Sequence, residues 1–206
     1  MKDPIRIYRH ALSGHSHRAQ LFASLAGIKH ELVDVDLMQG EHKKEPFLAI
    51  NPLGQVPAIV DGNYKLGDSN AILVYLARSY APDWIPKSTT EEAEMQRFLS
   101  IAANEIANGP AAARLVTVFG AKLDHDATKA KAHALFEKIE KHLDGREWLI
   151  GKRASLADVA VYSYTAHAPE GGVSLESYPR IRALLSRTEA LPGFVPMQPT
   201  KAGLVS

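Results

Sequence analysis

The chain has 206 residues, of which 46% are hydrophobic and 23% are charged. These proportions are ordinary for a globular protein and argue against disorder, and the length allows one large domain or two small ones. With 24 basic and 23 acidic residues, the formal net charge is +1. The chain therefore lacks the surplus of positive charge that phosphate binding needs, and we expect no nucleic-acid partner.

Cysteine is absent from the sequence. This excludes a disulfide framework, a thiolate zinc site, an iron–sulfur cluster and a cysteine nucleophile. Any sulfur chemistry must therefore use a sulfur atom that a ligand brings. The sequence has no long uncharged apolar run and its start lacks the apolar region of a secretory signal. We expect a cytoplasmic protein with no membrane partner.

The N-terminal part of the chain alternates between strand and helix patterns. Residues 5–8 alternate in polarity as a strand does, residues 15–28 carry an apolar stripe at helical spacing, and residues 31–37 return to a period of two. A strand–helix–strand succession favours parallel pairing with a right-handed crossover. We therefore expect the first two strands to lie parallel in one sheet.

A hairpin and a second helix are predicted next. Strand patterns at residues 56–60 and 64–66 are separated by Asp61-Gly62-Asn63, a strong signal for a tight turn. Residues 68–70 are typical of a helix start, and an apolar run follows them. This order of elements indicates a small α/β sandwich.

Strand patterns end at the proline-containing segment 82–88. Helical patterns then cover residues 89–108, 111–119, 126–143, 155–168 and 178–189. One of them opens with Ser155-Leu156-Ala157-Asp158, which predicts a capping box that stabilises the helix and takes no part in catalysis. We expect an α/β domain at residues 1–81, a linker at 82–88 and an all-helical domain at 89–206.

The segment Asn51-Pro52-Leu53-Gly54-Gln55-Val56-Pro57 carries the first candidate site. Pro57 stands at the head of an apolar strand, where proline costs a ladder hydrogen bond. A cis bond between Val56 and Pro57 would turn the backbone so that Val56 offers its N–H and C=O to an extended ligand. A trans proline on an edge strand is the alternative, favoured by roughly 4:1 from the dipeptide alone, since about 5–6% of such bonds are cis.

Two helix starts carry polar residues with two possible roles. At Asp68 and Ser69, free N–H groups and the helix dipole suit a carboxylate, to which Ser69 can donate while Asp68 pairs with an amine of the same ligand. In the turn after the first strand, the hydroxyls of Ser13 and Ser16 can also face a ligand. In both places, capping of the helix is the commoner role of such residues.

Other ligand-binding signals are weak or absent. His10, His15 and His17 lie close in sequence, but they lack the ligand spacing and the carboxylate partner of a metal site, so we expect no metal. The motifs GxGxxG, GxxxxGK[ST], GxSxG and HExxH do not occur. Nucleotide binding by such loops and serine hydrolysis at a nucleophile elbow therefore lose support.

Five short motifs follow one another in a characteristic order. They are Leu12-Ser13-Gly14, Gly40-Glu41-His42-Lys43, Asn51 to Pro57, Asp68-Ser69-x-Ala71-Ile72 and Ser155-Leu156-Ala157-Asp158. Together they resemble the cytosolic glutathione transferase family over essentially the whole chain. The resemblance implies a thioredoxin-like N-terminal domain followed by a helical-bundle C-terminal domain. It also implies a cis proline at Pro57 and a homodimer.

Within that family the first half is most similar to the serine-type branches, the phi-like enzymes and related bacterial proteins. Carried over by position, the resemblance implies that Ser13 donates to the glutathione sulfur, with Ser16 in reserve. It implies that the co-substrate glutathione is bound by His42, Lys43, Gln55, Val56, Pro57, Asp68 and Ser69. The sequence departs from the family pattern at Asp68, where Glu is more usual, and at His15, where Asn is common.

The resemblance implies a detoxifying transferase that adds the glutathione thiolate to hydrophobic electrophiles, with peroxidase as a side activity. Without cysteine, the branches that form a mixed disulfide with glutathione are excluded. We expect the electrophile pocket between the domains, lined by Leu12, Ile101, Asn104, Asn108 and Arg114. Two alternatives stay open. One is a non-catalytic binding or regulatory protein of the same fold, and the other is a glutathione-dependent isomerase or dehalogenase.

Overall fold

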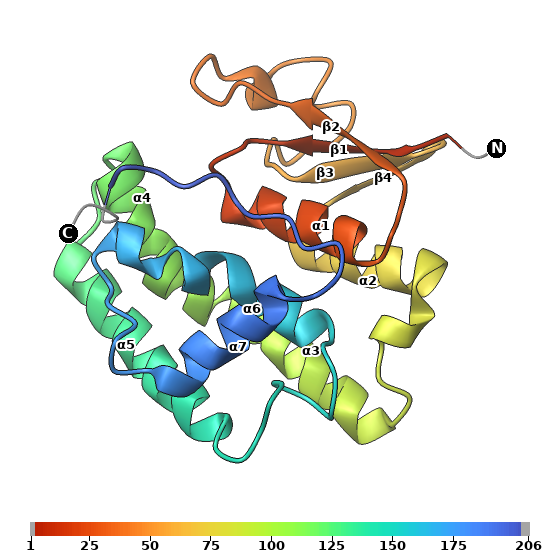
Figure 1. Ribbon diagram of the computed structural model, residues 1–206. Helices are drawn as coiled ribbons and strands as arrows, with labels where there is room; N and C mark the ends of the chain where they lie inside the picture. The colour runs from red at the N-terminus through yellow and green to blue at the C-terminus, as the bar shows by residue number, and fades with distance from the viewer. Residues whose placement is uncertain (1–2, 203–206) are drawn as a thin grey trace. The chain divides into compact units, whose positions relative to one another are not determined.

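The computed structural model describes residues 3–202, in which the chain divides into two units. The first consists of Met1–Trp84 with Leu191–Gln198, and the second of Ile85–Ala190 with Pro199–Ser206. The predicted fold class is confirmed, because a thioredoxin-like sheet with helices is followed by an all-helical unit (Figure 1). Among the described residues, no helix has the length and apolarity that crossing a bilayer requires.

The first unit contains one four-stranded sheet. Its strands are β1 (Ile5–Arg9), β2 (His30–Asp34), β3 (Ala58–Asp61) and β4 (Tyr64–Gly67), in the order β2-β1-β3-β4. As predicted, β1 and β2 are parallel, and β3 and β4 form an antiparallel hairpin. The strand expected from residue 56 begins at Ala58, after the Val56–Pro57 bond, which is cis.

Helices cover one face of this sheet and a loop covers the other. Helix α1 (Gly14–Leu25) and helix α2 (Ser69–Tyr80) lie side by side on the same face (Figure 1). On the opposite face, Val35, Phe47 and Ala58 form a buried apolar cluster. The segment between β2 and β3 contains Val35 and Phe47 and also the short 3₁₀ helix η1 (Glu41–Lys43). A second short 3₁₀ helix, η2 (Pro82–Trp84), ends the N-terminal part of the unit. The residues of β3 are thus buried on both faces of the sheet.

Helices are the regular secondary structure of the second unit within its described residues. Its elements are α3 (Thr89–Ala103), η3 (Ala107–Ala111), α4 (Ala112–Phe119), α5 (His125–His142), α6 (Leu156–Ala166), η4 (Ala168–Gly171) and α7 (Pro179–Glu189). The helix predicted at 89–108 ends earlier than expected, and the π-helical turn η3, which contains Pro110, precedes α4. Proline has no N–H for the α-helical ladder, which accounts for an irregular turn at this point.

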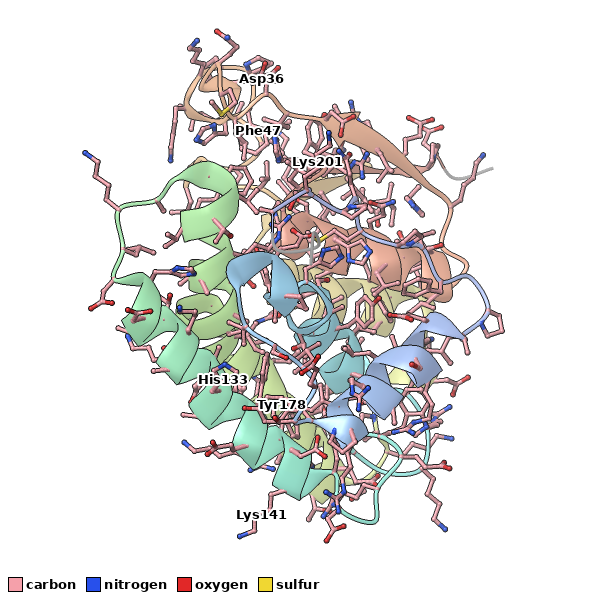
Figure 2. The ribbon with its side chains drawn as sticks, turned by 60° about the vertical axis from the view of Figure 1, so that its left-hand side comes forward. Asp36, Phe47, His133, Lys141, Tyr178 and Lys201 are labelled. Carbon is pink, nitrogen blue, oxygen red and sulfur yellow. The ribbon has the colours of Figure 1, made fainter. Side chains whose placement is uncertain are left out.

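Side-chain contacts stabilise the helical unit at the starts of α6 and α7. His133 of α5 lies beside Tyr178, the residue before α7, and their rings stack while His133 Nδ1 and the Tyr178 hydroxyl are 2.8 Å apart (Figure 2). At the start of α6, Ser155 and Asp158 form the predicted capping box. These contacts fix the starts of two helices against their neighbours.

The C-terminal segment departs from the domain expected at residues 89–206. Residues 191–198 belong to the first unit, where Ser24 Oγ donates to the Gly193 carbonyl at 2.6 Å and His17 Nε2 lies 2.9 Å from the Val195 carbonyl. Met197 is buried there as well. The backbone N–H and hydroxyl of Thr200 then donate to Glu170 of the second unit. These contacts are between residues distant in sequence, so the helical periodicity carried no sign of them.

Candidate active site

The strand register brings the predicted site segments to one end of the sheet. At this end, Arg9 of β1 pairs with Asp34 of β2, and Tyr8 pairs with Ala58 of β3. Ala58 in turn pairs with Gly67, the last residue of β4. The polar segments that follow or precede these residues therefore lie together at this end of the sheet, which we call its polar edge. They are residues 10–17, 35–45, 51–57 and 68–70.

Ser13 and Ser16 occupy different environments in the turn after β1. Ser13 is half-buried and caps α1, and its Oγ accepts from the Ser16 backbone N–H at 3.2 Å. Ser16 is fully buried, and its Oγ accepts from the backbone N–H of His10 at 3.2 Å. The hydroxyl hydrogen of Ser13 is thus not used in its cap, whereas the side chain of Ser16 lies inside the protein.

Asp68 caps α2 from an unusual backbone conformation. Its carboxylate accepts from the Ala71 backbone N–H at 2.8 Å. Its φ is +69°, in the region that favours glycine, and it is the non-glycine residue with positive φ among those described. Asp68 is exposed, and one of its two carboxylate oxygens caps the helix. Strained backbone of this kind occurs most often at binding and catalytic sites.

The start of α2 is tied to α1 by a buried arginine. Arg18 is fully buried, and its Nη1 donates to Ser69 Oγ at 2.8 Å and to Asn70 Oδ1 at 3.0 Å. His15 Nδ1 lies 3.4 Å from both Arg18 Nη1 and Ser69 Oγ. Burial, with a further contribution from the Arg18 charge, lowers the pKa of His15 to about 3. The role of Arg18 was not predicted, since a lone arginine within a helical pattern gives no signal of burial.

The loop before Pro57 lies against η1. A Cβ atom at Gly54 would stand 2.8 Å from the His42 carbonyl oxygen and 3.1 Å from Lys43 Nζ. Gly54 also has a φ of +58°. In the same region, His42 Nδ1 is a buried polar atom with no hydrogen-bond partner. Two of the predicted contact residues, His42 and Lys43, thus lie beside the Gly54–Gln55 turn.

Asn51 holds this turn in place from within. Its side-chain amide donates to the Gln55 carbonyl at 2.7 Å, and its Oδ1 accepts from the Leu53 backbone N–H at 3.2 Å. The contact with β4 is so close that a Cβ at Gly67 would lie 2.6 Å from the Asn51 amide. Asn51 therefore sets the backbone that leads into Val56.

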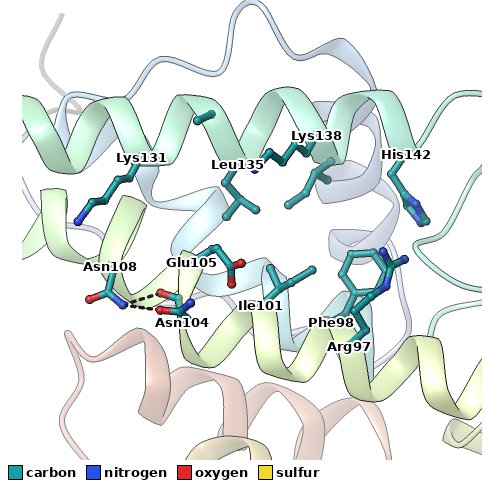
Figure 3. A pocket seen from close by; sticks show the side chains of 12 residues that line it. Arg97, Phe98, Ile101, Asn104, Glu105, Asn108, Lys131, Leu135, Lys138 and His142 are labelled. Atoms are coloured by element: carbon teal, nitrogen blue, oxygen red, sulfur yellow. Dashed lines mark hydrogen bonds between the residues drawn. The ribbon is translucent and has the colours of Figure 1, made fainter.

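Three of the predicted pocket residues line a cavity inside the second unit. Ile101, Asn104 and Asn108 face a space of about 460 Å³, and Asn108 Nδ2 donates to Asn104 Oδ1 at 2.9 Å (Figure 3). The opposite wall comes from α5, a contribution that the sequence did not reveal. Its lining residues there include Lys131, Leu135, Lys138 and His142. Leu12, the other predicted lining residue, belongs to the first unit.

Arg114, which was expected to line the electrophile pocket, is instead part of a buried ion pair. Its side chain is 2% exposed, and its Nε donates to the fully buried carboxylate of Glu170 at 2.5 Å. It does not line the cavity between α3 and α5. The reason is helical phase: Arg114 projects from α4 toward η4, with which α4 packs. A charged residue on an apolar helix is easily misread as a ligand contact when its buried counter-ion lies far away in sequence.

The comparisons with known proteins agree with this architecture. The model described as glutathione S-transferase, N-terminal domain, matches residues 3–78, and the model described as glutathione S-transferase, C-terminal domain, matches residues 92–192. Together they cover a thioredoxin-like unit with a polar edge and a helical unit, which is the class of protein that the fold and site define. The chain belongs to the glutathione S-transferase family.

Individual relatives extend over most of the chain. Glutathione S-transferase F10 of Arabidopsis thaliana is 35% identical over 74% of this chain and 75% of its own length. Human glutathione S-transferase theta-2 is 32% identical over 92% of this chain and 82% of its own length. The crystal structure of a glutathione S-transferase from Pseudomonas fluorescens superposes with a TM-score of 0.90 at 28% identity, covering 96% of this chain and all of that one. The similarity to plant and bacterial members agrees with the predicted branch.

Glutathione is the co-substrate that this family membership implies. Within residues 3–202, no three histidine or carboxylate side chains gather in a way that could hold a metal ion. The polar edge of the sheet instead offers hydroxyls, carboxylate, amide and backbone groups. These are the groups by which proteins hold a zwitterionic peptide.

Proposed function

We propose that this protein transfers the thiolate of glutathione to hydrophobic electrophiles, using the polar edge of its sheet as the glutathione site. The observation that carries the proposal is the strand register, because it gathers the segments of Ser13, His42, Val56 and Ser69 at one end of a single sheet. A tripeptide with a charged group at each end needs complementary groups spaced along its length. Four separate segments at one edge supply such spacing.

The two ends of glutathione would meet different groups. We assign the γ-glutamyl amine to the Asp68 carboxylate and its carboxylate to the Ser69 hydroxyl at the positive end of α2. The glycine carboxylate is assigned to Lys43 and to His42, whose buried Nδ1 lacks a partner within the protein. The cysteinyl backbone would pair with Val56 beside Pro57, with Gln55 adjacent.

Ser13 is our candidate for the sulfur contact. Its Oγ already accepts from the Ser16 N–H, which leaves the hydroxyl hydrogen for donation to the sulfur anion. The first turn of α1 also favours an anion through the helix dipole. Ser16 is the weaker candidate because it is fully buried. Hydrogen-bond donation to the thiolate lowers the pKa of the thiol.

Ionisation supplies only a small part of the rate. A free thiol of pKa ~8.5 is about 3% thiolate at pH 7. If the site lowers the pKa to about 6.5, the thiolate fraction rises ~25-fold, but nucleophilicity falls ~8-fold, for a net gain of about threefold. Most of the acceleration must therefore come from holding the electrophile against the sulfur. In the transfer, the sulfur lone pair forms the new S–C bond while a halide leaves with its bonding electrons.

The electrophile pocket remains a proposal as well. Ile101, Asn104 and Asn108 are its candidate residues in the second unit, and the cavity that they line there supports this. Leu12 is a candidate from the sequence alone. Arg114 is left out because its guanidinium is buried against Glu170. We also propose peroxidase as a side activity. The same thiolate can attack a hydroperoxide oxygen, which breaks the O–O bond and gives an alcohol and glutathione sulfenic acid, and a second glutathione thiol then displaces water from that sulfenic acid to form the disulfide. We also propose that the protein is cytoplasmic and forms a homodimer.

Titration calorimetry with glutathione, followed by an assay with an activated aryl halide, tests the proposed function. We expect saturable heat at sub-millimolar to millimolar glutathione and glutathione-dependent release of halide. Saturable binding without turnover across a panel of halides, epoxides and hydroperoxides would favour the non-catalytic alternative. Absence of heat at millimolar glutathione would refute the proposal outright.

A further inference from the structure

Two residues of α1 that are outside the proposed glutathione contacts reach the hydroxyl of Ser69. Arg18 Nη1 lies 2.8 Å from Ser69 Oγ, and His15 Nδ1 lies 3.4 Å from the same oxygen. The bond between Arg18 and Ser69 is buried. The three side chains therefore form one connected group, in which the direction of each hydrogen can be worked out.

Arg18 determines which way the first bond runs. A guanidinium has only donors and stays protonated at any working pH. The two hydrogens on Nη1 have close acceptors in Ser69 Oγ at 2.8 Å and Asn70 Oδ1 at 3.0 Å. Ser69 therefore accepts from Arg18, and the hydrogen of its own hydroxyl must point elsewhere.

His15 determines where that hydrogen goes when no ligand is bound. Burial, with a further contribution from the Arg18 charge, lowers the pKa of His15 to about 3, so the ring is neutral near neutral pH. A hydrogen on Nδ1 would face the Arg18 cation, whereas a lone pair there is attracted to it. The ring therefore carries its hydrogen on Nε2, and Nδ1 is an acceptor 3.4 Å from Ser69 Oγ. A contact of this length is weak and is easily exchanged for a better acceptor.

We propose that Arg18 and His15 are positioning residues that hold the Ser69 hydroxyl as a hydrogen-bond donor for a ligand carboxylate at the start of α2. The inference rests on the proposed function, which assigns the γ-glutamyl carboxylate to Ser69. It adds that this end of the site is built for an anionic acceptor. Because Arg18 occupies a lone pair of Ser69, a ligand amide N–H cannot be received there equally well. The site selects thiol peptides whose γ-glutamyl carboxylate is free over those in which it is amidated.

A double-mutant cycle on His15 and Ser69 tests the proposal through the KM for glutathione. His15→Leu removes the acceptor at similar volume, and His15→Asn keeps an acceptor oxygen close to the Nδ1 position. Because the ligand carboxylate must displace His15 Nδ1 as the acceptor of the Ser69 hydrogen, we expect His15→Leu to lower KM about twofold, the value of a weak hydrogen bond, with kcat at saturating glutathione nearly unchanged. His15→Asn should stay close to the unmodified protein. In a Ser69→Ala background, His15→Leu should have no further effect on KM.

Other results would overturn the proposal. These are an unchanged or raised KM in His15→Leu, an equal decrease in the Ser69→Ala background, or an equal decrease in His15→Asn. A merely structural role of His15 would lower the unfolding temperature and kcat in both backgrounds, because it would not act through Ser69.

A second measurement needs neither glutathione nor a variant. Long-range ¹H–¹⁵N NMR correlations of the histidine rings report the tautomer of each ring directly. We expect His15 to be neutral at pH 6 with its hydrogen on Nε2, whereas a hydrogen on Nδ1 would refute the arrangement. If the protein failed to bind glutathione, the proposed function would fail while this readout still decided the hydrogen-bond geometry. The NMR measurement also tests the proposal if the His15→Leu variant does not fold.

Discussion

The hydroxyl oxygen of Ser13 accepts a hydrogen bond from the backbone N–H of Ser16 at 3.2 Å, while the Ser16 hydroxyl is buried and accepts from His10. Two serines three residues apart are thus used differently. The first caps α1 and keeps its hydrogen available at the polar edge of the sheet. The second joins α1 to the end of β1. The difference arises from helical geometry, because the cap residue lies outside the helix and a first-turn residue can face inward.

Substitution of the two serines should therefore separate activity from stability. If Ser13 donates to the sulfur, Ser13→Ala should move the acid limb of the pH–rate profile upward, toward the ~8.5 of a free thiol, and reduce turnover at pH 6.5 about sixfold through ionisation alone. Glutathione affinity should stay within a few-fold. Ser16→Ala should leave the pH profile in place but cost about 0.5–1.5 kcal/mol of stability, because it removes the hydrogen bond from the His10 backbone N–H. Rate profiles and urea unfolding of both variants check this, and an unchanged profile in Ser13→Ala would contradict the assignment.

Gly54→Ala should disturb the turn that lies against η1. Its φ of +58° strains any side chain, and the new Cβ would stand 2.8 Å from the His42 carbonyl oxygen. Gly62→Ala is the matched control, since its φ is +59° but no atom lies within 4 Å of the added Cβ. Both should lose about 1–2 kcal/mol from the backbone conformation. Only Gly54→Ala should lose more than this and also bind glutathione more weakly. Equal losses in urea unfolding and calorimetry would show that the contact with His42 is unimportant.

Asp68→Asn should weaken glutathione binding without unfolding α2. An asparagine oxygen can still accept from the Ala71 N–H, and asparagine tolerates positive φ. The loss of charge should cost about tenfold or more in affinity if Asp68 pairs with the γ-glutamyl amine, since hydrogen bonds to charged groups are worth about 1.5–3 kcal/mol. Asp124→Asn is the control, because Asp124 caps α5 through an equivalent bond to Ala127 at 2.9 Å. Equal affinity in the two variants would remove Asp68 from the site.

Glu170→Gln should destabilise the second unit strongly at neutral pH. Burial raises the pKa of Glu170, but hydrogen bonds from His167, Thr200 and Arg114 outweigh it and hold that pKa below 4.5. The lowered pKa means that the carboxylate stabilises the fold above pH 4.5 and loses this effect as the pH falls through the folded-state pKa. Breaking a buried ion pair costs about 3–5 kcal/mol. The deficit of Glu170→Gln in urea unfolding should be largest at pH 7 and shrink below pH 4.5, and a constant deficit would contradict this.

Asp158 should show the opposite pH dependence. Burial raises its pKa from 3.8 to about 6, against the hydrogen bonds from Leu149 and Ser155 that favour the charged form. Because the folded state then binds a proton more readily than the unfolded state, the contribution of Asp158 to stability falls as the pH rises from about 4 to 6. Asp158→Asn should remove this slope while lowering stability throughout, since one amide oxygen cannot accept from all three donors, which are the Leu149 N–H and the N–H and hydroxyl of Ser155. Urea unfolding at pH 4, 5, 6 and 7 measures the slope.

Much of the architecture was predictable because its signals are local. Alternating polarity predicted the strands, the Asp61-Gly62-Asn63 turn predicted the hairpin, and Ser155 with Asp158 predicted the capping box that the structure contains. Each depends on residues a few positions apart, whose spacing reads directly as a period or a cap. Ser13, Ser16, Asp68 and Ser69 became candidates because each stands at a helix start, whereas His42 and Lys43 entered only through the family resemblance.

The sequence by itself determined the order of elements, the absence of any protein thiol and the segments that carry the polar groups. Only the tertiary structure decided that Arg18 is buried beneath Ser69, that Arg114 pairs with Glu170, and that residues 191–198 return to the first unit. Partners in such contacts are separated by 51 residues for Arg18 and Ser69 and by 56 for Arg114 and Glu170. Whether a charged side chain faces solvent or a counter-ion depends on how whole elements pack, and no local periodicity records that packing.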